Sequence, residues 1–337
     1  MNNAKNTSIT FGASCAINDD MLYVSSFIDA LPHDTDYTRM FVLNLKLPGA
    51  WFYHDIPDKT VTSVAMRHAS SEVPRATYAL CSDGTIEIYN STAVITETIP
   101  IHKNAGGMSS ITHIDDKVYA CGAGNQIYCR DSDTWIETAQ NLRELAQNIV
   151  NSIIEKISSK QEINIIELTG TARTLTSLEC IKGTHDDNVY ACGTNGTVLH
   201  WDGLEWQTVH SGTRQHLHDI HCVTADDIIM CGHNGVVIRG NHRIGFKRLL
   251  IEKTDVNFWS VRLFNQTLYL GSTSGLFNVH EKNLVKTRFD SLALPSHISI
   301  ESMDATDQTL WVVTTTFVLR LNSNAWELIE HPDNVPL

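Results

Sequence analysis

The stretch LHDIHCVTADDIIMCGHNGVVI, residues 217–238, holds the pattern that decides the fold. It contains two short runs rich in apolar and β-branched residues, at 219–223 and 228–231, separated by an acidic turn. A third apolar run, at 236–238, follows directly after the pair Asn234-Gly235. Short runs of this kind bounded by Gly, Asn and Asp are typical of strands joined by hairpins, and Asn-Gly favours the positive φ angles of a type I′ turn.

The same pattern recurs along the chain at a nearly constant interval. Cysteine followed by glycine closes the second run at Cys121, Cys192 and Cys231, and weaker copies stand at Cys81 and Gly271. Cys81 and Cys121 are 40 residues apart, Cys192 and Cys231 are 39 apart, and Cys231 and Gly271 are 40 apart. A period in this range indicates one supersecondary unit copied many times.

Each repeat has room for four strands, the last of which follows an aromatic residue at Trp51, Trp206 and Trp326. Four strands in about 40 residues are typical of a β-propeller blade. We therefore predict an all-β fold, a β-propeller of seven four-stranded blades forming a single domain over residues 1–337. A count of six or eight blades and a strand exchange between the termini both remain open. The predicted repeats start near Ile9, Val61, Met108, Leu175, Leu217, Phe258 and Ile298.

The central repeats resemble a known family. The motif Trp201-Asp202-Gly203, then Trp206, then Ser211-Gly212-Thr213, is similar to the repeats of bacterial WD-repeat-like β-propellers. The match is good over residues 175–240 and weak elsewhere. The resemblance implies the fold and leaves the function open, because propellers carry many unrelated activities.

Composition limits the classes of function. The net charge of −13 disfavours a nucleic-acid or anionic-membrane binder and suits either a basic protein partner or solubility alone. No apolar run approaches the ~20 residues of a membrane helix, and the first residues do not read as a secretion signal. The repeated cysteines occupy the same site of different blades, too far apart for disulfides, so we expect buried thiols in the cytoplasm.

A second periodic feature lies on the first strand of each repeat. A small polar residue precedes the innermost apolar residue, and the residue before it varies in type. We expect these variable residues to ring one mouth of the central channel, either as a recognition surface or as a plug. The predicted ring consists of Thr62, Met108, Thr176, His218, Trp259 and Ile298, with Phe11 as the counterpart in the first repeat.

Two insertions interrupt the repeats, where repeat proteins often place function. Apolar residues at helical spacing predict a helix around 140–158, within an insertion at 139–162, whose apolar stripe must pack on its own blade or contact a partner. A second insertion at 25–40 is either a functional loop or an ordinary long hairpin. The candidate partner-binding residues of the two insertions are Phe27, Asp34, Asp36, Tyr37, Arg143, Glu144 and Gln147.

Motifs for chemistry are weak in this sequence. His216, His218 and His221 are candidate metal ligands, but no cysteine or carboxylate stands at ligand spacing beside them, so no metal or other cofactor is expected. The sequence shows no Gly-x-Ser-x-Gly elbow, zinc-protease motif or phosphate loop. We therefore expect a protein without catalytic activity.

Together these features predict a protein-binding propeller. The hypothesis is an immunity or inhibitor protein that neutralises a toxin or enzyme by occluding it, and a basic partner is the version that the net charge suits. An assembly factor or scaffold is the first alternative. A glycan- or small-molecule-processing enzyme with its site at the channel mouth, near His218 and Trp259, is the second.

Overall fold

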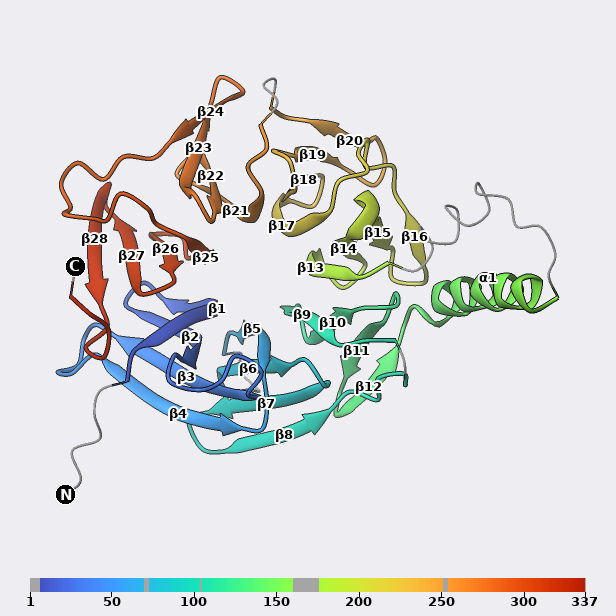
Figure 1. The fold of residues 1–337 in the computed structure, drawn as a ribbon, viewed down its shortest axis with the longest axis horizontal. Coiled ribbons are helices and arrows are strands. Elements are labelled where there is room, and N and C mark those ends of the chain that lie inside the picture. The colour runs from blue at the N-terminus through green and yellow to red at the C-terminus, as the bar shows by residue number, and fades with distance from the viewer. Residues whose placement is uncertain (1–6, 70–72, 104, 160–175, 251–253, 337) are drawn as a thin grey trace.

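The computed structural model describes residues 7–69, 73–103, 105–159, 176–250 and 254–336. In this part of the chain, 28 strands form seven four-stranded antiparallel sheets, arranged as blades around a central axis (Figure 1). Each sheet consists of four consecutive strands in chain order, with the first strand innermost. The predicted seven-bladed β-propeller is therefore confirmed.

The blades are bounded as follows. Blade 1 consists of β1 (Ile9–Asn18), β2 (Met21–Ile28), β3 (Tyr37–Asn44) and β4 (Trp51–Pro57). Blade 2 consists of β5 (Val61–Arg67), β6 (Ala76–Cys81), β7 (Thr85–Asn90) and β8 (Val94–Thr98). Blade 3 consists of β9 (Met108–Ile114), β10 (Lys117–Gly122), β11 (Ile127–Asp131) and β12 (Thr134–Glu137). Blade 4 consists of β13 (Leu178–His185), β14 (Asn188–Gly193), β15 (Val198–Trp201) and β16 (Trp206–Thr208). Blade 5 consists of β17 (Leu217–Thr224), β18 (Asp227–Gly232), β19 (Val237–Asn241) and β20 (Gly245–Arg248). Blade 6 consists of β21 (Phe258–Phe264), β22 (Thr267–Ser272), β23 (Gly275–His280) and β24 (Asn283–Lys286). Blade 7 is β25 (Ile300–Ala305), β26 (Thr309–Thr314), β27 (Phe317–Asn322) and β28 (Ala325–Glu330).

The innermost strands begin close to the predicted repeat starts. Five starts coincide with the prediction, while β13 and β25 begin a few residues later, at Leu178 and Ile300. Leu175, the predicted start of the fourth repeat, lies outside the described residues. The Asn-Gly turns have the expected positive φ angles. The φ angles of Asn195 and Asn234 are 58° and 51°, and the glycine after each also has a positive φ angle.

The core lies between neighbouring blades. One cluster joins Tyr78 and Leu80 of blade 2 to Ile111 and Val118 of blade 3, all almost fully buried, and equivalent clusters follow around the ring. Full burial of one aliphatic side chain stabilises the folded state by about 1.5–3 kcal/mol. All eight cysteines are free, as expected, and seven of them are buried. Burial raises the pKa of Cys180 to about 12, so this thiol stays protonated and packs as a small apolar group.

The ring closes without a strand exchange, because the first and last blades are each built from four consecutive strands. Side chains and the C-terminal residues join the two blades. The indole nitrogen of Trp51 donates to the carbonyl of Glu330 at 3.2 Å, and the Asn334 side chain accepts from the backbone of Ile9 at 2.8 Å. The buried ring of His331 packs against Phe41 and Trp51, with centroids 4.5 and 4.7 Å away.

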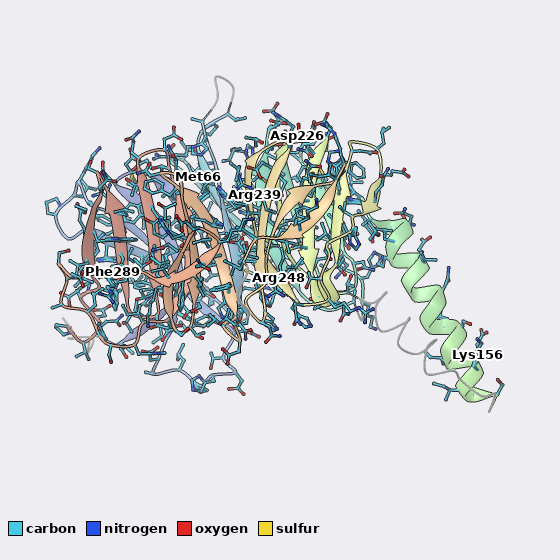
Figure 2. All side chains as sticks on the ribbon, turned by 90° about the horizontal axis from the view of Figure 1, so that it is seen from above. Met66, Lys156, Asp226, Arg239, Arg248 and Phe289 are labelled. Atoms are coloured by element: carbon cyan, nitrogen blue, oxygen red, sulfur yellow. The ribbon has the colours of Figure 1, made fainter. Side chains whose placement is uncertain are left out.

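The predicted helical insertion is a helix, α1 (Gln140–Ser158), that follows the outermost strand of blade 3. It stands away from the ring instead of covering its own blade, and its far end near Lys156 points away from the face that carries Met66 and Asp226 (Figures 1 and 2). Leu142 at its base packs against the core between blades 3 and 4. Three further apolar side chains are more than half exposed: Leu145, Ile154 and Ile157. None of the described helices is long and apolar enough to cross a membrane.

Candidate binding site at the channel mouth

Every innermost strand carries a β-bulge near its first residue. In blade 5, Leu217 pairs with Gly232 and Asp219 pairs with Cys231, which leaves His218 without a partner opposite it. The same irregularity recurs on the other innermost strands. A bulge leaves one residue outside the ladder and turns its side chain in a new direction. The bulge residues of blades 2 to 7 are Thr62, Ser109, Glu179, His218, Trp259 and Glu301.

These six residues line a cavity of about 360 Å³ at one end of the central channel, together with Gly12, Ala13 and Phe27 of blade 1. Residues that are far apart in the sequence thus form one continuous surface. The composition of this mouth differs around the ring. Thr62 and Ser109 are small, whereas Glu179, His218, Trp259 and Glu301 bring two carboxylates and two aromatic rings to the other side.

The small or polar residue after the bulge has a structural role in three blades. The hydroxyl of Ser63 accepts a hydrogen bond from the backbone N–H of Ile111 in the next blade at 3.1 Å. The hydroxyl of Ser110 accepts in the same way from Ile181 at 3.3 Å, and the carboxylate of Asp219 accepts from Val261 at 2.9 Å. In these three blades the position therefore links adjacent innermost strands, whereas the equivalent hydroxyl of Ser260 in blade 6 has no hydrogen-bond partner in the described structure.

The structure places three of the predicted residues at the mouth: Thr62, His218 and Trp259. It places the other three elsewhere, and Phe11, their counterpart in the first repeat, is buried and stands before the bulge of β1. Met108 stands before the bulge and is buried, while Thr176 and Ile298 precede the first residues of β13 and β25. Ile298 lines a separate cavity on blade 6.

Two of the misplacements, those of Thr176 and Ile298, have a common cause. Ser177-Leu178 and Ser299-Ile300 resemble the small-polar-then-apolar pair, but the true pairs are Cys180-Ile181 and Ser302-Met303. In blade 3, Ser109 and Ser110 stand in tandem, so the bulge could be assigned to the wrong residue.

Three mouth residues were missed by this assignment: Ser109, Glu179 and Glu301. The ladder pairing with the second strand could have found the first two. Ser110, Cys180 and Asp219 each pair with the cysteine of the Cys-Gly turn, at Cys121, Cys192 and Cys231, so counting back 11 or 12 residues from that cysteine gives the register.

Aromatic rings form a continuous wall on one side of the mouth. The ring of His218 lies 4.3 Å from that of Trp259 and 4.6 Å from that of His233, between centroids. His233 in turn stacks on His216 at 5.0 Å. Burial lowers the pKa of His218 to about 4 and also lowers that of His233, so both imidazoles are neutral at pH 7.

The candidate metal ligands do not converge. His216 and His218 both contact His233, but His221 lies deeper and lines a second cavity of about 560 Å³ at the opposite end of the channel. Among the described residues, no group of three or more His, Cys, Asp or Glu side chains is placed to hold a metal ion.

A charged layer separates the two cavities. The guanidinium of Arg262 lies 2.7 Å from the carboxylate of Asp219 and 3.5 Å from that of Asp304, and the first two side chains are only 11% exposed. Lys182 lines both cavities. The base of the mouth is thus fixed by an ion-paired arginine, and a lysine stands beside it.

The insertion at 25–40 is a long hairpin between β2 and β3. Phe27 extends to the channel mouth and also lines a cavity of about 500 Å³ with Tyr37. Asp36 accepts a hydrogen bond from the Thr60 hydroxyl at 2.7 Å, which holds the hairpin against blade 2, and Asp34 is exposed.

The polar candidates on α1 have different surroundings. Arg143 forms an ion pair with Glu137 at 2.7 Å, which fixes the base of the helix. The exposed Glu144 accepts a hydrogen bond from the side-chain amide of Gln140 at 2.7 Å. Gln147 lies within the helix, but its side chain is outside the described residues.

Comparison with known proteins shows the fold and one sequence relative. No family model matches the chain. It is 23% identical to "Immune protein Tsi7" of Pseudomonas aeruginosa over 228 residues, which cover 67% of this chain and 65% of that protein. The match therefore spans just under two thirds of the length of that relative.

Solved β-propellers cover nearly the whole chain. The structure titled "YCF48 bound to D1 peptide" matches with a TM-score of 0.60 at 10% identity, over 98% of this chain and 95% of that one. The WD40 propeller of Doa1 matches with a TM-score of 0.59 at 11% identity, over 93% and 92% of the two chains. The RRP9 WD40 repeats match with a TM-score of 0.60 at 14% identity, over 92% and 88%. These similarities confirm a WD40-like propeller.

Proposed function

We propose that the chain is an immunity protein that binds a toxin or enzyme and neutralises it by occlusion, without catalysis of its own. The observation that carries the proposal is the similarity to a protein named an immune protein. The propeller fold supports it, because a rigid ring with varied side chains at one mouth is suited to recognition of another protein.

The mouth, the hairpin between β2 and β3, and α1 are the surfaces that we propose for the contact. Phe27 and Trp259 are exposed aromatic residues at the mouth, and aromatic residues are enriched at the energetic centres of interfaces. The far end of α1 extends on the side away from Met66, which is the side of the mouth (Figure 2). A partner seated over the mouth could therefore also reach the exposed residues Leu145, Ile154 and Ile157.

We further propose that the protein acts in the cytoplasm and that its partner is basic. The net charge of −13 supports the second point, because opposite net charges accelerate association at low ionic strength.

The test is to purify the tagged full chain from its native host at low and at high salt and to identify what remains bound. The expected result is one stoichiometric protein at low salt that is lost at high salt. Expression of that protein alone should arrest growth or supply an enzymatic activity, and co-expression of the full chain should suppress it. If no protein is retained at either salt concentration, the proposal is wrong.

An assembly factor is the second candidate function. The similarity of the whole ring to a propeller solved with a bound peptide favours it, because such a role needs only peptide binding. The same experiment separates the two candidates. A stable complex with a partner that is neither toxic nor inhibited would favour the assembly factor.

A further inference from the structure

We propose that the channel mouth binds the side chain of a lysine or arginine presented by the protein partner, between the rings of Trp259 and His218 and the carboxylates of Glu179 and Glu301. This inference rests on the proposed function in that it requires a protein partner. It adds the chemical class of the group that enters the mouth.

The aromatic side of the mouth has the geometry of a cation-binding wall. Trp259 is 38% exposed although it lies on an innermost strand, and its ring contacts His218 at 4.3 Å and His233 at 5.6 Å. An indole face attracts a cation that approaches within about 6 Å of its centre. The neighbouring imidazole of His218 is neutral at pH 7 and does not repel such a cation.

The hydrogen-bonding capacity of this wall is also incomplete. The Nε2 atom of His218 is buried and has no partner among the described residues. A neutral imidazole nitrogen can donate or accept one hydrogen bond, and leaving it unpaired in a buried position is unfavourable. Because this atom is buried, the His218 ring must shift on binding before the atom can accept from an ammonium or guanidinium N–H placed against the wall.

The carboxylates supply the opposite charge. Glu179 and Glu301 line the same cavity, and neither forms an ion pair with a cation in the described part of the chain. The nearest described polar partner of Glu301 is the hydroxyl of Ser299 at 2.9 Å. Burial raises the pKa of Glu179, and the hydrogen bond with Ser177 and the neighbouring His216 offset this effect only in part. A guanidinium or ammonium entering the mouth would provide further compensation.

The charged layer below sets the depth of entry. Arg262 is already paired with Asp219 and Asp304, and Lys182 lies three residues beyond Glu179 on the same strand. Both cations repel a third cation that moves deeper. The inserted group is therefore held at the level of the bulges, beside the two glutamates, and the channel does not conduct it further.

The first test uses the full chain labelled with 5-fluorotryptophan and two capped pentapeptides, Gly-Gly-Arg-Gly-Gly and the same peptide with neutral citrulline. The fluorine resonance of Trp259 is assigned by its absence in Trp259→Phe. We expect this resonance to shift with the arginine peptide and to stay in place with the citrulline peptide. No shift with the arginine peptide, or equal shifts with both, would overturn the proposal.

Variants then separate charge from fold. Glu179→Gln with Glu301→Gln should weaken arginine-peptide binding about tenfold, whereas Glu281→Gln, at an exposed turn of blade 6, should leave it unchanged. The double variant must keep the thermal midpoint of the parent chain for this comparison. Unchanged affinity in a folded double variant would contradict the role of the carboxylates.

The partner retained in native purification distinguishes this inference from the proposed function. If Trp259→Ala and the double glutamate variant retain that partner as the parent chain does, the partner docks elsewhere and the inference fails while the function stands. If the arginine peptide binds but no protein partner is found, the mouth is a cation site and the proposed function fails.

Discussion

Two neighbouring positions on the innermost strands, the bulge residue and the residue after it, follow opposite rules. The residue after the bulge is small or polar in most blades, and in three of them its side chain accepts a hydrogen bond from the backbone of the next blade. The bulge residue ranges from serine to tryptophan and lines the mouth. The fold constrains one position and leaves the adjacent one available for recognition.

Blade 5 shows this contrast most clearly, because His218 and Asp219 are adjacent on β17. Asp219 accepts from the backbone of Val261 and pairs with Arg262, both in blade 6. The side chain of His218 contacts the rings of His233 and Trp259 at the mouth, and its Nε2 atom has no hydrogen-bond partner in the described structure. We therefore expect stability to depend on Asp219 and recognition to depend on His218.

The largest predicted effect is on the stability of Asp219→Ala. This change leaves Asp304, at 3.5 Å, as the remaining carboxylate beside the buried guanidinium of Arg262, and should lower the free energy of unfolding by about 3–5 kcal/mol. His218→Ala removes no hydrogen bond and should cost about 1 kcal/mol or less. Urea unfolding of both variants measures the difference. As a control, Asp227→Ala breaks an exposed ion pair with Arg239 and should cost at most about 1 kcal/mol. Equal losses of unfolding free energy in all three variants would show that stability does not depend more on Asp219 than on His218.

The sequence was sufficient to predict this architecture because the repeats encode it locally. Strand alternation, Asn-Gly turns and the Cys-Gly period gave the blade count, five of the seven inner-strand starts and the extent of α1. These features depend on interactions between residues close in the sequence.

The mouth was predicted only in part, because its register depends on the bulges. A bulge shifts the alternation by one residue, and a chance Ser-apolar pair three residues early moved the assignment at Thr176 and Ile298. The direction of α1 was also not predictable, because apolar spacing predicts a helix without saying what its apolar residues contact. Leu142 packs on the ring and Ile157 does not.

The next predicted effect is a pH dependence that comes from the channel side of the same strand. His221 faces Arg262, Asp219, Asp304 and Lys182, and burial, with a smaller contribution from Arg262, lowers its pKa to about 4. The unfolded chain binds a proton near pH 6.5, so between pH 6.5 and 4 the unfolded state binds more protons than the folded state. The free energy of unfolding is therefore unaffected by His221 above about pH 6.5. It falls by on the order of 3 kcal/mol as the pH is lowered from 6.5 to 4.

His221→Gln checks this effect. The free energy of unfolding of the variant should fall less steeply between pH 6.5 and 4 than that of the parent chain. His280→Gln, which changes an exposed histidine at the end of β23, should leave the slope unchanged. A slope in His221→Gln equal to that of the parent chain would show that His221 takes up its proton in the folded state as readily as in the unfolded one.

The smallest predicted effect is also the sharpest form of the comparison, because blade 3 has serine at both positions. Ser110→Ala leaves the backbone N–H of Ile181 without its acceptor between two innermost strands and should cost about 1 kcal/mol. Ser109→Ala removes a hydroxyl that lines the mouth and should change stability by less than about 0.5 kcal/mol. The side-chain chemistry is the same in both variants, so a difference in urea midpoint measures the position alone. If Ser109→Ala were as destabilising as Ser110→Ala, the bulge residue would also belong to the structural frame, and variation at the mouth could no longer be attributed to recognition.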